Sequence, residues 1–246
     1  MRSKLAHDFV PAANHEPRKG GKLPDLLLLH YTGMKSATAA IDWLGRAESG
    51  VSCHYVVDEE GRITQMVSEA ERAWHAGVSV WNGERDINSC SIGIEIQNPG
   101  HEFGYAEFAP AQMDAVVALC ADIIARHDIK PQRVLAHSDV APLRKMDPGE
   151  KFSWFRLWQE GIGLWVEPAP LDTPGMSFRE GAEGPPVQAL QSLLAAFGYG
   201  IDITGVYDPL TTAVITAFQR HWRPARVDGV ADPSTAKTLH SLLLSL

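Results

Sequence analysis

The stretch AHSDVAPLRKMDPG, from Ala136 to Gly149, brings a histidine, a lysine and two aspartates into one segment whose prolines favour a loop. The preceding residues RVLA have the composition of a short buried strand, so we expect His137 at the end of that strand. Side chains at strand ends often converge on a cleft. His137 and Asp147 need only one further nitrogen or oxygen ligand to form a three-residue metal site with an open position.

A second apolar strand offers that third ligand. Four consecutive leucines precede His30 in DLLLLHYT, a run that is typical of a central strand covered on both faces. His30 and His137 would each end a core strand, with Asp147 in the adjoining loop. A lone histidine is usually only a hydrogen-bonding side chain, but two imidazoles and one carboxylate suit zinc and leave a fourth position for water.

Length and charge limit the classes of function. The chain has 246 residues, enough for one large domain or two smaller ones. A formal net charge of −8, with only Arg18 and Lys19 as a short basic pair, argues against nucleic acid or an anionic membrane as the main partner. Three cysteines without paired spacing are expected to be buried thiols: Cys53, Cys90 and Cys120.

Residues 1–23 form an N-terminal extension with a positive start but no apolar run before His7 and Asp8. We therefore expect neither a secretory signal nor membrane insertion, and a cytoplasmic location. The periplasm or cell envelope is the alternative if a leader has been removed. The sequence gives no indication of the oligomeric state.

Residues 24–166 mix strand and helix patterns. Ser36 can cap a helix, and SCHYVVDEEGRITQMV reads as a hairpin that turns at Gly61. Apolar residues then recur every three or four positions from Pro110 to His127, which predicts a long amphipathic helix. The order of these elements predicts an α/β or α+β fold, with a central mixed sheet flanked by helices.

The strand SIGIEIQNPG contains a charged residue that needs an explanation. Ile92, Ile94 and Ile96 share one face of this strand, so Glu95 lies on the opposite face. A glutamate in the middle of a buried strand is costly without a partner or a function.

The composition changes after the first domain. Residues 167–185 are rich in proline and glycine and read as a linker. Residues 186–246 contain three helical patterns, which predict a second, small all-α three-helix domain. Its second and third helices start in GVYDPLT and GVADPST, where Asp208 and Asp232 are placed as N-caps before a proline.

Residues 24–160 resemble the zinc-dependent N-acetylmuramoyl-L-alanine amidases, a type that includes peptidoglycan recognition proteins and phage T7-type lysozyme. The segments that carry the resemblance are LLLLHYT, SCHYVVDEEGRI, AWHAG, SIGIEIQNPG and AHSDVAPLRKMDPG, in that order. The resemblance implies one zinc ion per chain on His30, His137 and Asp147. It also implies that Glu95 is the catalytic acid and base, and that Lys145 is a polarising cation.

Four further residues of the matched segments are expected to line the substrate groove: His54, Trp74, His75 and Asn98. Trp74 would offer an apolar face to a sugar or lactyl group, although core packing explains it equally well. Asp139 has no assigned chemistry and is interpreted as a loop residue that hydrogen-bonds nearby backbone. The remaining histidines show no converging pattern and are assigned to solvent or helix faces: His7, His15, His101, His127, His221 and His240.

The C-terminal residues 186–246 resemble the three-helix peptidoglycan-binding module attached to many wall hydrolases. The segments VQALQSLLAAFGY, TGVYDPLTTAVITAFQRHW and VDGVADPSTAKTL carry this resemblance. A packing or dimerisation unit is the alternative, because the Asp-Pro caps serve helix starts and not a ligand. We expect the module to be separable, so that deleting the chain beyond Gly184 leaves hydrolysis of soluble muropeptides intact.

The two resemblances together imply a bacterial hydrolase of peptidoglycan or of anhydro-muropeptides in recycling. It would cut the amide bond between the lactyl group of N-acetylmuramic acid and the L-alanine of the stem peptide. One alternative is a zinc peptidase acting within that peptide, faintly suggested by Ser52-Cys53-His54. Another is a recognition protein that binds without cutting, but such a protein could dispense with Glu95 and with the zinc ligands.

Overall fold

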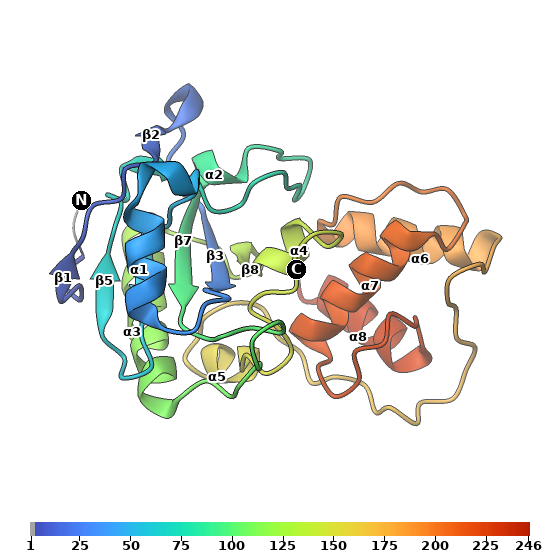
Figure 1. The fold of residues 1–246 in the computed structure, drawn as a ribbon. Helices are drawn as coiled ribbons and strands as arrows, with labels where there is room; N and C mark the ends of the chain where they lie inside the picture. The colour runs from blue at the N-terminus through green and yellow to red at the C-terminus, as the bar shows by residue number, and fades with distance from the viewer. Residues whose placement is uncertain (1–2) are drawn as a thin grey trace.

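A mixed β-sheet forms the centre of the computed structural model, which describes residues 3–246 (Figure 1). Its strands are β1 (Asp8–Phe9), β3 (Leu26–Tyr31), β4 (Tyr55–Val57), β5 (Ile63–Gln65), β7 (Ser91–Ile96) and β8 (Val134–Ala136). They are ordered β1-β5-β4-β7-β3-β8, and β4 pairs antiparallel with β5 while the other neighbours are parallel. A separate antiparallel pair is formed by β2 (His15–Pro17) and β6 (Glu71–Ala73).

Helices flank the sheet, as the sequence predicts for this fold class. The helices before the C-terminal region are α1 (Ala37–Gly45), α2 (Ile87–Cys90), α3 (Pro110–His127), α4 (His137–Val140) and α5 (Trp154–Gln159), with short 3₁₀ turns at η1 (Lys19–Gly21), η2 (Ala47–Ser49) and η3 (Pro131–Arg133). The Ser36 hydroxyl accepts a hydrogen bond from the Ala39 amide at the start of α1. The predicted α/β (α+β) class, with a central mixed sheet and flanking helices, is confirmed.

The leucine-rich strand β3 is central and separates two apolar cores. Leu27 and Leu29 pack with the isoleucines of β7 and with helix α3 on one face. Leu26 and Leu28 belong to a different cluster on the other face. Because side chains alternate along a strand, His30 follows Leu26 and Leu28 onto that second face.

The C-terminal region contains the three predicted helices, α6 (Pro185–Phe197), α7 (Pro209–Trp222) and α8 (Pro233–Leu244). The side chain of Asp208 accepts a hydrogen bond from the Thr211 amide, and that of Asp232 accepts one from the Thr235 amide. Both aspartates are therefore N-caps, and in each case the next residue is the proline that starts the helix.

These helices are packed against the sheet domain and share its core (Figure 1). A single apolar cluster contains Leu26 and Leu28 of β3, Trp81 from the segment between β6 and α2, and Leu194 and Trp222 of the C-terminal helices. Helix α7 lies against the short helix α4. The expectation that deleting the chain beyond Gly184 leaves hydrolysis of soluble muropeptides intact does not fit such an interface.

The N-terminal residues also belong to the fold. Strand β1 extends the sheet beyond β5, and β2 pairs with β6. Arg18 is buried, and its guanidinium donates hydrogen bonds to the backbone carbonyls of Glu69, Ser89 and Ser91. Burial lowers the pKa of Arg18 to about 10, so its charge is retained at neutral pH.

Candidate metal centre and active site

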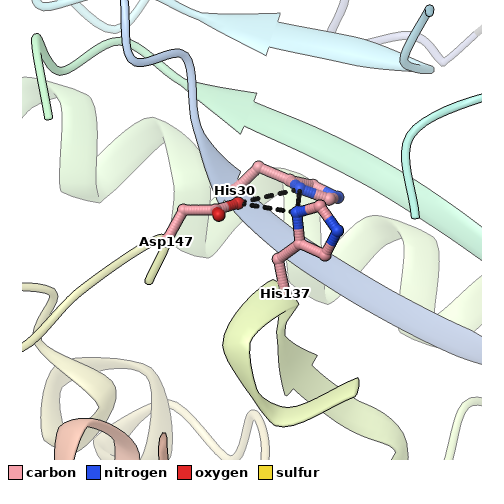
Figure 2. Close-up of side chains that lie close together, drawn as sticks. All are labelled: His30, His137 and Asp147. Carbon is pink, nitrogen blue, oxygen red and sulfur yellow. Dashed lines mark hydrogen bonds and ion pairs between the residues drawn. The ribbon is translucent and has the colours of Figure 1, made fainter. Parts of the chain in front are cut away.

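Three side chains from distant parts of the chain point toward one another (Figure 2). Nδ1 of His30 lies 2.9 Å from Nδ1 of His137 and 3.1 Å from Oδ2 of Asp147. Nδ1 of His137 lies 2.9 Å from the same carboxylate oxygen. All three side chains are buried, so no bulk water separates them.

The backbone brings these residues together at the carboxyl end of the central strands. His30 is near the end of β3, and β3 pairs with both β7 and β8. His137 is the first residue of α4 and directly follows β8, one position later than the strand end that the sequence predicts. Asp147 follows in the next loop, where the Ser138 amide donates a hydrogen bond to its backbone carbonyl at 3.1 Å.

Hydrogen bonds to the outer ring nitrogens determine where the histidine protons lie. Nε2 of His137 is 3.0 Å from the carbonyl oxygen of Ala76, so this nitrogen must carry the proton and donate it. The neutral ring then has a free lone pair on Nδ1, which faces His30 and Asp147. A hydrogen bond from the outer nitrogen is the usual way in which proteins orient a metal-binding histidine.

His30 is oriented by a second histidine. Its Nε2 lies 3.0 Å from Nδ1 of His75, and Nε2 of His75 lies 3.2 Å from the hydroxyl of Ser91. A proton on Nε2 of each ring satisfies both contacts and leaves Nδ1 of His30 unprotonated. His75 is itself positioned by Asn88, whose side-chain oxygen accepts hydrogen bonds from the His75 and Ala76 amides.

This arrangement fits a cation. Burial, followed by the neighbouring His137, lowers the pKa of His30 to about 4, which keeps its ring neutral at physiological pH. Three acceptor atoms therefore face one another without a proton between them. Two imidazole nitrogens and a carboxylate are a common ligand set for catalytic zinc.

Glu95 lies beside this cluster. It is paired in register with His30 on the neighbouring strand β7, and so their side chains lie on the same face of the sheet. Its Oε2 atom is buried without a hydrogen-bond partner among residues 3–246. Burial and the charge of Asp147 raise the pKa of Glu95 well above its ordinary value, although Lys145 opposes this shift.

A cavity of about 490 Å³ opens over the cluster. Its lining includes the three clustered residues together with Glu95, Lys145, Trp74 and His75. Apolar side chains form much of the remaining wall: Met34, Trp43, Leu44, Val51 and Met146. Small-molecule sites commonly combine a mainly apolar wall with a few converging polar groups.

Two residues that the sequence predicts in the groove have structural positions instead. Nδ1 of His54 accepts a hydrogen bond from the Gly93 amide, and burial together with Arg18 lowers the pKa of this ring to about 3. The Asn98 side chain binds the backbone of Gly100 and Ala106, which shapes the turn after β7. Neither His54 nor Asn98 lines the cavity.

Two histidines assigned to solvent or helix faces lie elsewhere. His101 lines the cavity, where its Nδ1 is 3.0 Å from the Tyr31 hydroxyl. His221 is buried, and its Nδ1 is 2.6 Å from Oδ2 of Asp139. Asp139 does accept a hydrogen bond from nearby backbone, the Ala136 amide, but its carboxylate also contacts Tyr199 and His221 of the C-terminal region. No local pattern distinguishes these residues, because Tyr31 lies 70 positions from His101 and Asp139 lies 82 positions from His221.

A mixed sheet with two histidines and one aspartate clustered at the end of its central strands defines the class of protein, an α/β protein with a candidate catalytic metal centre. Residues 20–150 match the family model described as N-acetylmuramoyl-L-alanine amidase. Residues 183–239 match a model of a peptidoglycan binding domain. The chain belongs to the family of N-acetylmuramoyl-L-alanine amidases.

Individual relatives agree with this assignment. The N-acetylmuramoyl-L-alanine amidase AmiD of Escherichia coli (strain K12) is 40% identical over 237 residues, which cover 89% of this chain and 82% of AmiD. The 1,6-anhydro-N-acetylmuramyl-L-alanine amidase AmpD of Enterobacter cloacae is 29% identical over 165 residues, covering 60% of this chain and 86% of AmpD.

Solved structures show the same fold over nearly the whole chain. AmiD from E. coli, in complex with anhydro-N-acetylmuramic acid-L-Ala-D-gamma-Glu-L-Lys, superposes with a TM-score of 0.78 at 36% identity and covers 95% of this chain and 92% of its own. AmpDh3 from Pseudomonas aeruginosa, in complex with anhydromuramic pentapeptide, has a TM-score of 0.78 at 31% identity, with coverages of 95% and 96%.

The structure also bears on the cysteines and on membrane insertion. The three cysteines are free and buried, as the sequence predicts: Cys53, Cys90 and Cys120. Among residues 3–246, no helix combines the length and the apolar character that crossing a bilayer requires.

Proposed function

We propose that this chain is a zinc-dependent amidase in which His30, His137 and Asp147 hold one zinc ion. Its reaction is hydrolysis of the amide bond between the lactyl group of N-acetylmuramic acid and the L-alanine of the stem peptide. The substrate is peptidoglycan or an (anhydro-)muropeptide. The observation that carries the proposal is the buried cluster of three proton-free acceptor atoms, in which both ring orientations are fixed from outside. The anhydromuramyl peptides bound by AmiD and AmpDh3 support this class of substrate.

The mechanism assigns one task to each polar group of the cavity. Zinc held by His30, His137 and Asp147 would be the Lewis acid that acidifies a water molecule and polarises the scissile carbonyl. Glu95 takes the proton of the attacking water and returns it to the nitrogen of the departing alanine. A carboxyl whose pKa is raised by burial suits the return step, because it gives up its proton more readily to an amine than to bulk water at neutral pH.

Lys145 provides a positive charge in the same cavity. Negative charge develops on the carbonyl oxygen during attack, and a fixed cation close to that oxygen lowers the barrier. The backbone amide of Lys145 donates a hydrogen bond to the Ala141 carbonyl at 3.0 Å, which fixes the start of its loop. We assign Lys145 to stabilisation of this oxyanion.

Two cavity residues receive different tasks. Trp74 presents an indole to the cavity and is assigned to the sugar or lactyl group of the substrate. His75 orients His30 through its ring nitrogen, so we assign it to the metal site and not to substrate binding.

The alternative of a zinc peptidase built on Ser52-Cys53-His54 has little support. Ser52 donates its hydroxyl hydrogen to the Asn14 carbonyl and accepts from the Trp74 amide, so it acts as a structural bridge. Cys53 and His54 are buried away from the cavity. The cytoplasmic location expected from the N-terminal sequence stays a prediction.

The proposal is tested by separating metal binding from proton transfer. Glu95→Gln should retain one zinc per chain in elemental analysis and should lose about 10²- to 10⁴-fold in kcat, the usual contribution of a general acid and base. Glu59→Gln, in the exposed hairpin turn, is the matched control and should keep full activity. Zinc-free wild-type protein with full activity, or a Glu95→Gln variant with normal kcat, would contradict the proposal.

A further inference from the structure

Helix α7 of the C-terminal module reaches the amidase domain with two consecutive residues, Arg220 and His221. Nδ1 of His221 lies 2.6 Å from Oδ2 of Asp139, and both side chains are almost completely buried. Nε of Arg220 lies 3.4 Å from Oε2 of Glu150, and this ion pair is partly exposed. The two amidase residues in these pairs follow two of the clustered metal-site residues closely in the sequence.

Asp139 lies in the single turn of helix α4, which His137 begins. Besides the imidazole of His221, its carboxylate accepts hydrogen bonds from the Ala136 amide at 2.8 Å and from the Tyr199 hydroxyl at 2.9 Å. The Asp139 carboxylate therefore binds the amide of the residue directly before His137, while the Asp139 backbone lies two residues after His137. Two of its three donors belong to the C-terminal module.

The ring of His221 is held in one orientation. It is stacked between the indoles of Trp154 and Trp222, with ring centroids 3.6 Å apart on each side and interplanar angles of 21° and 6°. A flat ring in such a sandwich cannot swing away from Asp139 without breaking both stacks. The short contact between Nδ1 and the carboxylate is therefore a rigid link between the two domains.

The second link concerns the segment after Asp147. Glu150 follows Asp147 by three residues, and its carboxylate lies between Arg220 and Nε2 of His101, 3.3 Å away. The amide of Ser138 donates to the Asp147 carbonyl, so the two segments contacted by α7 are also bonded to each other.

We infer that helix α7 positions the metal site: His221 acts on His137 through Asp139, and Arg220 acts on Asp147 through Glu150. The C-terminal module is then a structural part of the catalytic centre, whatever else it binds. His221 and Arg220 are positioning residues, since neither contacts the clustered atoms. This inference rests on the proposed zinc site.

The test compares zinc affinity in the full-length protein by competition with a chromophoric chelator. His221→Phe preserves a flat ring for stacking and removes the donor to Asp139. It should lower zinc affinity about 10-fold, the lower end of the effect of losing a direct outer partner of a metal ligand, because His221 acts through Asp139. Arg220→Met should lower it by about two- to fivefold, because its ion pair is partly exposed.

Controls separate positioning from general destabilisation. His240→Phe and Arg179→Met alter exposed residues of the C-terminal region and should leave zinc affinity unchanged. His221→Asn, whose amide nitrogen can take the place of Nδ1, should recover most of the affinity even if the lost stacking lowers the melting temperature. The visible spectrum of the cobalt-substituted protein should change in His221→Phe and return toward wild type in His221→Asn.

The outcomes distinguish this inference from the proposed function. Wild-type protein that binds no zinc would refute the metal site itself. Tight zinc binding by wild type, with affinity within twofold in folded His221→Phe, would refute only the positioning role of α7. If His221→Phe does not fold, Arg220→Met decides the question: a zinc affinity equal to that of Arg179→Met overturns the inference, and a loss of at least twofold upholds it.

Discussion

Replacing Glu69 by glutamine should destabilise the protein strongly at neutral pH and weakly in acid. The Glu69 side chain is 1% exposed and connects helix α3 to the sheet. Its carboxylate accepts hydrogen bonds from Arg126, from His127 at 2.8 Å and from the Tyr55 hydroxyl at 2.5 Å. A buried carboxylate with this many donors is stable only in its charged form.

The size of the effect follows from the pKa. Burial alone would raise the pKa of Glu69, but the hydrogen bonds from Arg126, His127 and Tyr55 outweigh it and lower the pKa from 4.5 to about 2. At about 1.36 kcal/mol per pH unit, this difference corresponds to about 3 kcal/mol. Because the folded-state pKa is lowered, this stability is present above pH 4.5 and is lost as the pH falls toward 2.

Urea unfolding followed by tryptophan fluorescence measures this difference. Glu69→Gln should lose about 3 kcal/mol at pH 7, and the gap to wild type should narrow steadily below about pH 4.5. Glu59→Gln, in an exposed turn, should stay within about 0.5 kcal/mol of wild type. A loss below about 1 kcal/mol at pH 7, or a loss that is the same at pH 7 and pH 3, would refute the reasoning.

Three further predictions concern the catalytic centre and the domain interface. Lys145→Met should lower kcat about 100-fold with zinc content unchanged, because the positive charge that stabilises the oxyanion is lost. Lys130→Met is the exposed control. Equal kcat in both variants would contradict the role of Lys145. Zinc at 1,000 times its Kd should add about 4 kcal/mol to the stability of the metal-free protein and raise its Tm by about 8–16 °C; calorimetry that shows no shift would argue against a structural coupling of metal and fold. Truncation after Gly184 should yield insoluble or unfolded protein in a sedimentation and circular dichroism assay. Each apolar side chain that loses its cover costs about 2 kcal/mol, so the loss of several together approaches the whole free energy of unfolding of a typical domain. A soluble, folded and active truncation would refute the shared core. The residues before Gly184 that belong to this shared cluster include Leu26, Leu28, Trp81, Leu135 and Val140.

Local signals in the sequence account for most elements of the fold. The hydroxyl of Ser36 and the carboxylates of Asp208 and Asp232 form the caps that their positions indicate. Helix α3 runs from Pro110 to His127, the limits that its apolar spacing predicts. Such signals act over one helical turn or one strand, so the sequence displays them directly.

The cluster of His30, His137 and Asp147 could also be anticipated. Each histidine comes at or just after the end of an apolar strand, and parallel neighbouring strands end at the same edge of a sheet. The sequence therefore places both rings at one edge. The loop of Asp147 is short enough to bring its carboxylate to the same point.

Contacts between the domains could not be anticipated. Asp139 and His221 are 82 residues apart, and nothing in the sequence near either residue indicates the other. The module resembles a separate unit because its helices have their own caps and apolar pattern. The apolar faces that it shares with Leu26 and Leu28 look the same in sequence as faces buried within one domain.

The groove residues show a similar limit. Trp74 and His75 line the cavity, whereas His54 and Asn98 come from matched segments of the same kind but bind backbone instead. The direction of a side chain in a loop depends on the turn geometry around it, and segment similarity does not carry that information.

Mass spectrometry of the products from a soluble anhydro-muropeptide tests the central claim most directly. Incubation with the zinc-loaded protein should release the free stem peptide with an N-terminal alanine and leave a peptide-free anhydro-N-acetylmuramic acid. Glu95→Gln should form neither product at a comparable rate. Fragments in which alanine stays attached to the sugar would show cleavage within the peptide, and would contradict the assignment of this chain's reaction.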